Sequence, residues 1–451
     1  MQYYNLHSHV FTMKNAPEKF LSLYLPTLAA NLIDTLTNTP AGSRTFAAVL
    51  SKLPGNGTKR YASFLSIGKS ADEIDVFKQL TANYDPDFKF AALTMYMESL
   101  GIGGSQSGFE GQLEGVMDIK EQYPDQALLF LGIDPRWKGS ATELRQTVEQ
   151  KFNYRLPVSA GRSVFPYVGL KLYPSTGFYA FDSLLTETFE WAADNGVPII
   201  SHCNYLGGIY NNDEMYIKSY LSTQPDPYNK NATYNKPTYY SKFSFGKWLL
   251  GTNTDKNNKY TCSYFLEPAS YATLMKYFDT NRQLHDTANS DQWFDAYRQS
   301  LTQLTGNMRQ PLKLCLAHYG GDDHIRMQNG LQKAETPVGV SNINWCQQIR
   351  TLIGQFEGMY TDIAYALYDP AIHQFIINDL EDATLGDRIL FGTDYFLTEQ
   401  ELPEKKDYMA FKTTAQAHPM SRITGLTAWD VIASRNAERF LHSKYFDGKV
   451  I

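Results

Sequence analysis

The sequence predicts an α/β fold, a (β/α)8 TIM barrel, and three observations support this prediction. Short apolar runs rich in β-branched and aromatic residues recur, polar or glycine-containing turns follow them, and segments of helical periodicity come next. This alternation is typical of parallel βα units. Eight such runs fit a closed barrel better than a doubly wound sheet. The runs cover residues 2–6, 88–95, 127–133, 167–172, 197–201, 312–317, 358–363 and 388–392.

The helices between these strands are predicted from their apolar spacing. Over residues 108–122, Leu113, Val116 and Ile119 fall on one face, as in an amphipathic helix that packs on a sheet. The same periodicity predicts helices over residues 181–195, 267–278 and 428–442. The apolar strand at 197–201 is typical of a parallel strand buried on both faces.

Two connections are too long to be plain βα loops. Residues 13–87 follow the first strand and are mostly helical in pattern, with a glycine-containing break at 55–57. Residues 204–309 follow the fifth strand and begin with a segment rich in Tyr and Asn. Both leave the ends of strands where barrel enzymes build active sites, so we expect cap-forming insertions in one domain, 1–451. The Tyr/Asn-rich part has an alternative role as an oligomer contact or surface loop.

Composition and charge indicate a small-molecule substrate. The chain has 451 residues, 43% of them hydrophobic, and 41 basic against 47 acidic residues give a net charge of −6. No basic run forms a nucleic-acid footprint. The four cysteines form no C-x-x-C pair, which argues against a disulfide framework or a cysteine zinc site.

The chain is expected to be cytoplasmic and not membrane-bound. Its first residues show no basic segment followed by an apolar one, and no uncharged apolar run is long enough to span a bilayer. Self-association into a homo-oligomer is compatible with a barrel of this size, although the sequence identifies no surface for it.

His7 and His9 end the first predicted strand. Residues two apart on a strand point the same way, so two imidazoles can reach one metal ion. Paired surface histidines are common, and the pattern alone is therefore a weak signal.

Four further ionisable residues accompany other predicted strands. His202 and His318 each follow an apolar strand, where a lone histidine is more often a hydrogen-bonded packing residue than a ligand. Asp394 follows the eighth strand and has an alternative role as a helix N-cap. Lys171 lies within the apolar fourth strand and needs a partner or a function there. Together, ionisable residues of strands one, four, five, six and eight would converge at one barrel mouth.

This set of motifs resembles the amidohydrolase superfamily, in its amidohydrolase-related branch of metal-dependent TIM-barrel hydrolases and decarboxylases. The resemblance spans both ends of the chain. The motifs are Leu6-His7-Ser8-His9, Val168-Gly169-Leu170-Lys171-Leu172-Tyr173-Pro174, Ile200-Ser201-His202, Leu316-Ala317-His318-Tyr319-Gly320-Gly321, Phe391-Gly392-Thr393-Asp394 and Asn436-Ala437-Glu438-Arg439-Phe440-Leu441. The two long insertions depart from a typical member and leave the substrate undefined.

The resemblance implies one divalent metal, zinc or a similar ion. Its ligands would be His7, His9, His202 and Asp394, with His318 beside them or acting as the catalytic base. In an alternative arrangement, Asp394 is the base, a carboxylated Lys171 bridges two metals, and His202 and His318 bind the second. We favour one ion because the branch that these motifs resemble usually works with one.

Metal-assisted hydrolysis of a C–N or C–O bond, in an amide, lactone or ester, is the leading functional hypothesis. The metal would activate a water molecule, and Asp394 or His318 would take its proton. Non-oxidative decarboxylation of an aromatic or unsaturated acid is the alternative. An inactive barrel that only binds a ligand is less expected, because all five ligand and base candidates are present.

The remaining candidates would contact the substrate. Arg136 follows the third strand and could clamp a carboxylate, or could equally pair with a neighbouring acid. Tyr173 and Tyr205 follow the fourth and fifth strands closely enough to face the site. Three weaker candidates also lie at strand ends: Glu98, Asp362 and Tyr365.

Overall fold

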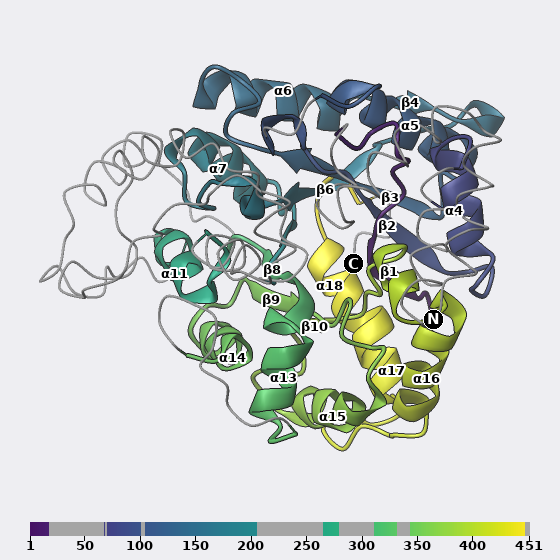
Figure 1. Ribbon diagram of the computed structural model, residues 1–451, viewed down its shortest axis with the longest axis vertical. Coiled ribbons are helices and arrows are strands. Elements are labelled where there is room, and N and C mark those ends of the chain that lie inside the picture. The colour runs from purple at the N-terminus through teal and green to yellow at the C-terminus, as the bar shows by residue number, and fades with distance from the viewer. Residues whose placement is uncertain are drawn as a thin grey trace, which may run out of the picture.

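The computed structural model describes residues 1–17, 67, 70–100, 104–204, 265–278, 311–331 and 343–446. Eight parallel strands form one sheet in chain order, which confirms the predicted barrel. Figure 1 shows helices around these strands. The strands are β1 (Tyr4–Ser8), β2 (Lys89–Leu93), β3 (Ala127–Ile133), β6 (Tyr167–Leu172), β7 (Ile199–Ser201), β8 (Leu314–Leu316), β9 (Met359–Asp362) and β10 (Ile389–Leu390).

The last strand returns to the first and closes the barrel. The backbone N–H of Leu6 donates to the carbonyl of Phe391 at 2.9 Å, and that of Asp394 donates to the carbonyl of His7 at 2.8 Å. A Cβ at Gly392 would lie 2.6 Å from the Cβ of His7, which is closer than real side chains approach. This seam between β1 and β10 therefore requires glycine at position 392.

The barrel interior is filled by side chains and is sealed at the N-terminal ends of the strands. Leu6, Phe130 and other inward residues form a buried cluster with Phe440 of α18 (Asn436–Leu441). The ring of Phe440 lies 5.0 Å from that of Tyr360, and the Lys313 ammonium, before β8, donates to the Phe440 carbonyl at 3.1 Å. The opposite ends of the strands are thus the available mouth.

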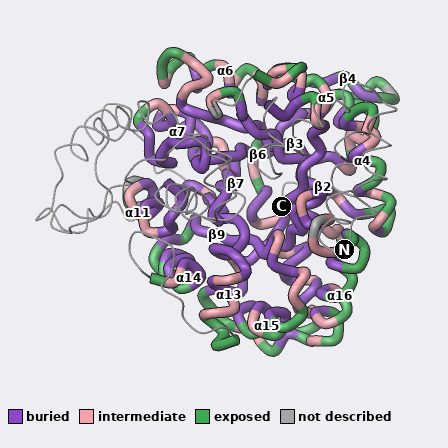
Figure 2. Tube along the Cα trace, in the orientation of Figure 1, coloured by how far each residue is buried: buried purple, intermediate pink, exposed green. Residues whose placement is uncertain are grey.

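The outer helices bury their apolar faces against the sheet, and Figure 2 shows buried segments at the centre with exposed ones at the periphery. In α5 the buried residues include Leu113, Val116 and Ile119, as the spacing predicted. The helices are α4 (Glu73–Thr81), α5 (Gly108–Gln122), α6 (Ala141–Asn153), α7 (Thr186–Asp194), α11 (Pro268–Tyr277), α13 (Asp322–Gln328), α14 (Trp345–Gln355), α15 (His373–Glu381), α16 (Glu404–Gln416) and α17 (Ala428–Asp430). A short antiparallel pair joins β4 (Leu156–Pro157) and β5 (Ser163–Val164).

Some predicted boundaries differ from the structure. The first strand begins at Tyr4, because Tyr4 is the first residue paired with β2. The helix predicted over 428–442 is divided by a π-helical turn at Val431–Arg435. There the carbonyl of Ile432 accepts a hydrogen bond from the backbone N–H of Phe391, directly after β10. This carbonyl therefore bonds to the strand end at the point where the helix changes from α to π.

The predicted insertions are described only in part. Helix α4 lies within the first and agrees with its helical pattern. The break at 55–57 and the Tyr/Asn-rich segment lie outside the described residues. Among the described helices, none combines the length and apolar character that crossing a bilayer requires.

Candidate metal centre

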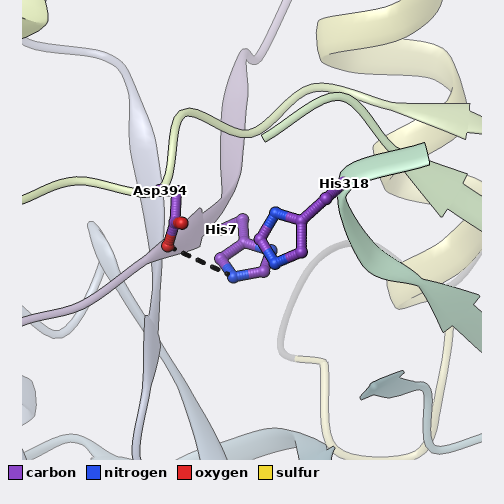
Figure 3. A group of neighbouring side chains, drawn as sticks. All are labelled: His7, His318 and Asp394. Carbon is purple, nitrogen blue, oxygen red and sulfur yellow. Dashed lines mark ion pairs between the residues drawn. The ribbon is translucent and has the colours of Figure 1, made fainter. Parts of the chain in front are cut away.

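The predicted ionisable side chains lie together at the barrel mouth. His7, His9, His202, His318 and Asp394 are each no more than 8% exposed. Figure 3 shows His7, His318 and Asp394 pointing toward one another from three separate parts of the chain. Their ligand atoms all lie within 4.8 Å of one another. Strand ends that are distant in sequence thus supply one buried polar cluster.

An irregularity in β1 aims His7 at this cluster. The pairing of β1 with β2 shifts register between Asn5 and Ser8, as in a β-bulge. Leu6 packs in the barrel interior, yet the next residue, His7, also faces inward and places its Nε2 atom 3.4 Å from Lys171 Nζ. Strict alternation along the strand would have turned one of these two side chains away.

Asp362, at the end of β9, orients two of the histidines. Its Oδ2 atom accepts a hydrogen bond from His7 Nδ1 at 2.8 Å, and its Oδ1 atom accepts the backbone N–H groups of His318 at 2.8 Å and Ala364 at 3.1 Å. Burial alone raises the pKa of the Asp362 carboxyl, but its contacts with His7 and His318 outweigh burial and hold this pKa below its usual range. An ionised Asp362 therefore keeps the His7 proton on Nδ1 and leaves the Nε2 lone pair toward the cluster.

The same reasoning assigns the other tautomers. His318 Nδ1 faces the carbonyl of Ala364 at 3.1 Å and is therefore a donor, so His318 Nε2 is an acceptor. That nitrogen lies 3.0 Å from His202 Nδ1, which must be the donor. His202 Nε2 is then a buried lone pair, and none of the described residues forms a hydrogen bond with it. His9 Nδ1 faces the carbonyl of Leu93 at 3.3 Å, which leaves its Nε2 lone pair 3.2 Å from Asp394 Oδ1.

This donor set fits a divalent metal. The Nε2 lone pairs of His7 and His9 both face Asp394 Oδ1, at 3.6 and 3.2 Å. Burial lowers the pKa of His7 to about 3 and that of His202 well below its ordinary value, so both rings are neutral, as metal ligands must be. The pKa of the Asp394 carboxyl lies below its usual range although burial raises it, so Asp394 can supply a carboxylate oxygen. Three imidazoles and one carboxylate are the ligands typical of zinc.

His318 groups with His7 and Asp394, and its ring has a defined tautomer. Its Nε2 atom already accepts the proton of His202 Nδ1, whereas His202 Nε2 has no partner in the part of the chain that the structure describes. The Nε2 lone pair of His202 is therefore open among the described residues, and that of His318 is occupied.

Unusual backbone conformations surround this centre. Among the described residues other than glycine, positive φ angles occur at His318 (67°), Tyr319 (50°), Tyr365 (62°) and Asp394 (66°). All four follow β8, β9 or β10. Such conformations cost free energy and tend to persist at functional sites.

Lys171 is 1% exposed and adjoins the ligands. Burial lowers the pKa of its ammonium to about 8, while the charges of Asp362 and Asp394 act in the opposite direction. The amine is therefore mostly protonated at neutral pH, which disfavours the carboxylated form that a two-metal centre would use.

The structure places two of the three predicted substrate contacts. Tyr173 lies against the centre, with its ring 5.0 Å from that of His202. Arg136 donates to Asp134 Oδ1 at 2.7 Å and to the Thr176 carbonyl at 3.0 Å, which is the pairing with a neighbouring acid that the sequence left open. Tyr205 lies outside the described residues.

Asp362 is the residue whose importance the sequence understated. Its place after the seventh predicted strand makes it one of three weaker candidates for lining the mouth. Its contact with His7 joins residues 355 positions apart, and no local pattern signals such a pair.

Fold and site together define a barrel protein with a candidate metal centre at its mouth. A family model described as amidohydrolase matches residues 85–442. The chain therefore belongs to the amidohydrolase family of metal-dependent enzymes, as the motifs indicated. His7 and His9 precede the matched region. No curated protein matches the sequence.

Three solved structures align with nearly the whole chain at low identity. IDCase from Metarhizium anisopliae, in its apo form, has a TM-score of 0.43 and 13% identity over 98% of this chain and 97% of that one. A 5-carboxyvanillate decarboxylase variant from Novosphingobium aromaticivorans, with bound manganese and 3-methoxy-4-hydroxy-5-nitrobenzoic acid, has a TM-score of 0.42 and 10% identity, with 98% and 97% covered. The 5-carboxyvanillate decarboxylase from Sphingomonas paucimobilis has a TM-score of 0.42 and 11% identity, with 98% and 99% covered.

Proposed function

We propose that this enzyme is a metal-dependent decarboxylase that removes the carboxyl group of a small aromatic or unsaturated acid without oxidation. The observation that carries the proposal is the buried ammonium of Lys171, 3.4 Å from His7 Nε2. A buried cation beside the ligands attracts an anionic group of the substrate. Arg136, the carboxylate clamp considered from the sequence, is bound to Asp134, so Lys171 takes that role in this proposal.

We further propose that one divalent ion, zinc or a similar metal, is held by His7, His9, His202 and Asp394. When bound, such an ion stabilises negative charge that develops on a substrate oxygen. Lys171 would donate hydrogen bonds to the substrate carboxylate and orient it. Tyr173, packed against His202, would contact the apolar part of the substrate.

His318 is the proposed proton carrier. Burial lowers its pKa, and its Nδ1 hydrogen is directed to the Ala364 carbonyl, so Nε2 is the atom that accepts a proton. In a decarboxylation this nitrogen would leave its hydrogen bond with His202, take a proton from water and donate it to the substrate carbon. The bond between that carbon and the carboxyl group breaks, carbon dioxide leaves, and the electron pair that stays on carbon binds the proton, so one proton from water is consumed per turnover.

Hydrolysis of a C–N or C–O bond is the second candidate. The neutral His318 and the ionised Asp394 are both bases at the same centre, and either could deprotonate water. The family description, amidohydrolase, is consistent with this chemistry. The sequence alone favours hydrolysis as the reaction. The position of Lys171 in the structure is the reason that we propose decarboxylation instead.

Metal content and product chemistry test the proposal together. Protein purified without a chelator or a histidine tag should contain about one metal ion per chain by mass spectrometry. His7→Ala and Asp394→Ala should lose both metal and activity. Full activity in either variant would contradict the ligand assignment.

A panel of aromatic and unsaturated acids, beside amides, lactones and esters, separates the two reactions. Decarboxylation in D2O should release carbon dioxide and leave one deuterium on the product carbon. Lys171→Met should abolish this turnover while the metal content stays unchanged. Turnover of amides or esters alone, with solvent oxygen in the product, would favour hydrolysis.

A further inference from the structure

A closed ring of hydrogen bonds lies at the seam between β1 and β10. Its members are Asn5, Tyr84, Thr393 and Glu404, none more than 9% exposed. Asn5 Nδ2 donates to the Tyr84 hydroxyl at 3.0 Å and to Thr393 Oγ1 at 2.8 Å. The Thr393 hydroxyl donates to Glu404 Oε1 at 2.7 Å, and the Tyr84 hydroxyl donates to the same oxygen. Because a hydroxyl has one hydrogen, the direction of every bond in the ring is fixed.

The ring is connected to both strand ends that carry predicted ligands. Since both hydrogens of the Asn5 amide are used in the ring, its Oδ1 atom is left to accept the backbone N–H of His7, at 3.2 Å. Thr393 immediately precedes Asp394, and the backbone N–H groups of both donate to the His7 carbonyl, at 3.3 and 2.8 Å. A displacement of the ring would therefore move His7 and Asp394 relative to each other.

We propose that Glu404 is a positioning residue of the metal centre. As the shared acceptor of the two hydroxyls, it fixes Asn5 and Thr393 and thereby the backbone at His7 and Asp394. This inference rests on the proposed role of those two residues as ligands. Glu404 belongs to α16, so the ring also ties an outer helix to the barrel seam.

The surroundings of Glu404 support a specific role. Its second oxygen, Oε2, is buried and has no hydrogen-bond partner among the described residues, and the same holds for both carboxyl oxygens of Asp407 on the next turn. Burial raises the pKa of Glu404 to about 7. Burying a carboxyl oxygen without a hydrogen-bond partner costs free energy. The other hydrogen bonds of Glu404 must offset this cost. The contacts that remain are the bonds from Thr393 and Tyr84.

Backbone hydrogen exchange of the metal-free protein tests the positioning directly. Glu404→Leu removes the acceptor, and exchange at Leu6 and Asp394 should rise about tenfold, while exchange within β2 and β3 stays unchanged. Glu404→Gln keeps an oxygen for both hydroxyls and should restore slow exchange. Glu381→Leu removes another hydrogen-bonded carboxylate, which accepts from Ser421 and His418, and serves as the matched control.

Zinc affinity supplies the second readout. Glu404→Leu should bind zinc about 10- to 100-fold more weakly than the wild type, with Glu404→Gln close to the wild type. If Glu404→Leu does not fold, Thr393→Val and its rescue by Thr393→Ser carry the same test. The proposal would be overturned if Glu404→Leu left hydrogen exchange at Leu6 and Asp394 unchanged. It would also be overturned if exchange rose equally over the whole sheet, or by the same amount in the control Glu381→Leu. A wild type that binds neither zinc nor a similar divalent metal would instead refute the proposed function, and hydrogen exchange would still decide the role of Glu404.

Discussion

Replacing Asp362 by asparagine should switch the tautomer of His7. Asparagine keeps one side-chain oxygen, and the backbone N–H groups of His318 and Ala364 require it at the Oδ1 position. Its NH2 group must then face His7 Nδ1, where the carboxylate now accepts at 2.8 Å. His7 would accept at Nδ1 and carry its proton on Nε2, the atom directed at the metal centre.

The size of the effect follows from the bond that is lost. A hydrogen bond to a charged group contributes about 1.5–3 kcal/mol, and about 1.4 kcal/mol corresponds to a tenfold change in affinity. Asp362→Asn should therefore weaken metal binding about 10- to 100-fold, the range found when partners of metal ligands are removed.

Competition with a chromogenic chelator measures this affinity, and the melting temperature of the metal-free protein reports folding. Asp379→Asn is the matched control, because Asp379 is buried and accepts from Tyr319 at 2.7 Å and from Arg350. Zinc affinity of Asp362→Asn within about threefold of the wild type would refute the tautomer argument.

Three further predictions concern the same centre. His202→Ala should lose metal, whereas His318→Ala should retain it and lose turnover; mass spectrometry of both variants would show the reverse if His318 were the ligand. Because burial raises the pKa of Glu404 from 4.5 to about 7, the folded chain holds a proton that the unfolded chain releases, so stability should fall by up to about 3 kcal/mol as pH rises from about 5 to 7. Urea unfolding should show a shallower pH dependence in Glu404→Gln, and an identical dependence would contradict this assignment. Gly392→Ala would place a Cβ 2.6 Å from that of His7 and should destabilise the protein by about 1–3 kcal/mol, which an unchanged melting temperature would exclude.

The strands were predictable because their local sequence differs sharply from its surroundings. Residues 127–133 and 167–172 were predicted with the bounds that β3 and β6 have, and all eight predicted runs overlap a strand. The helix over 108–122 was likewise exact, since one apolar face is enough to define it. The predicted ends of helices and strands differ from the structure where a backbone hydrogen bond to a distant segment sets the boundary, as between Phe391 and Ile432.

The candidate site was predictable in its residue types and less so in its contacts. His7, His202, His318, Asp394 and Lys171 stand out as ionisable residues in or after apolar strands, and parallel strands bring them to one end of a barrel. The sequence could not show that Asp362 accepts from His7, or that Asp134 already binds Arg136. Pairing of charged side chains depends on rotamers and distances, which residue spacing does not specify.

The sequence by itself determined the barrel, the family and the set of ionisable residues at the mouth, because each is encoded in local patterns that repeat along the chain. Only the tertiary structure decided which nitrogen of each histidine faces the centre, how the β1 bulge turns His7 inward, and why Glu404 is buried beside the seam. Those features arise from hydrogen bonds between segments up to several hundred residues apart, such as His7 with Asp362 and Asn5 with Thr393. Closure of the barrel creates these contacts, and no shorter stretch of the chain contains them.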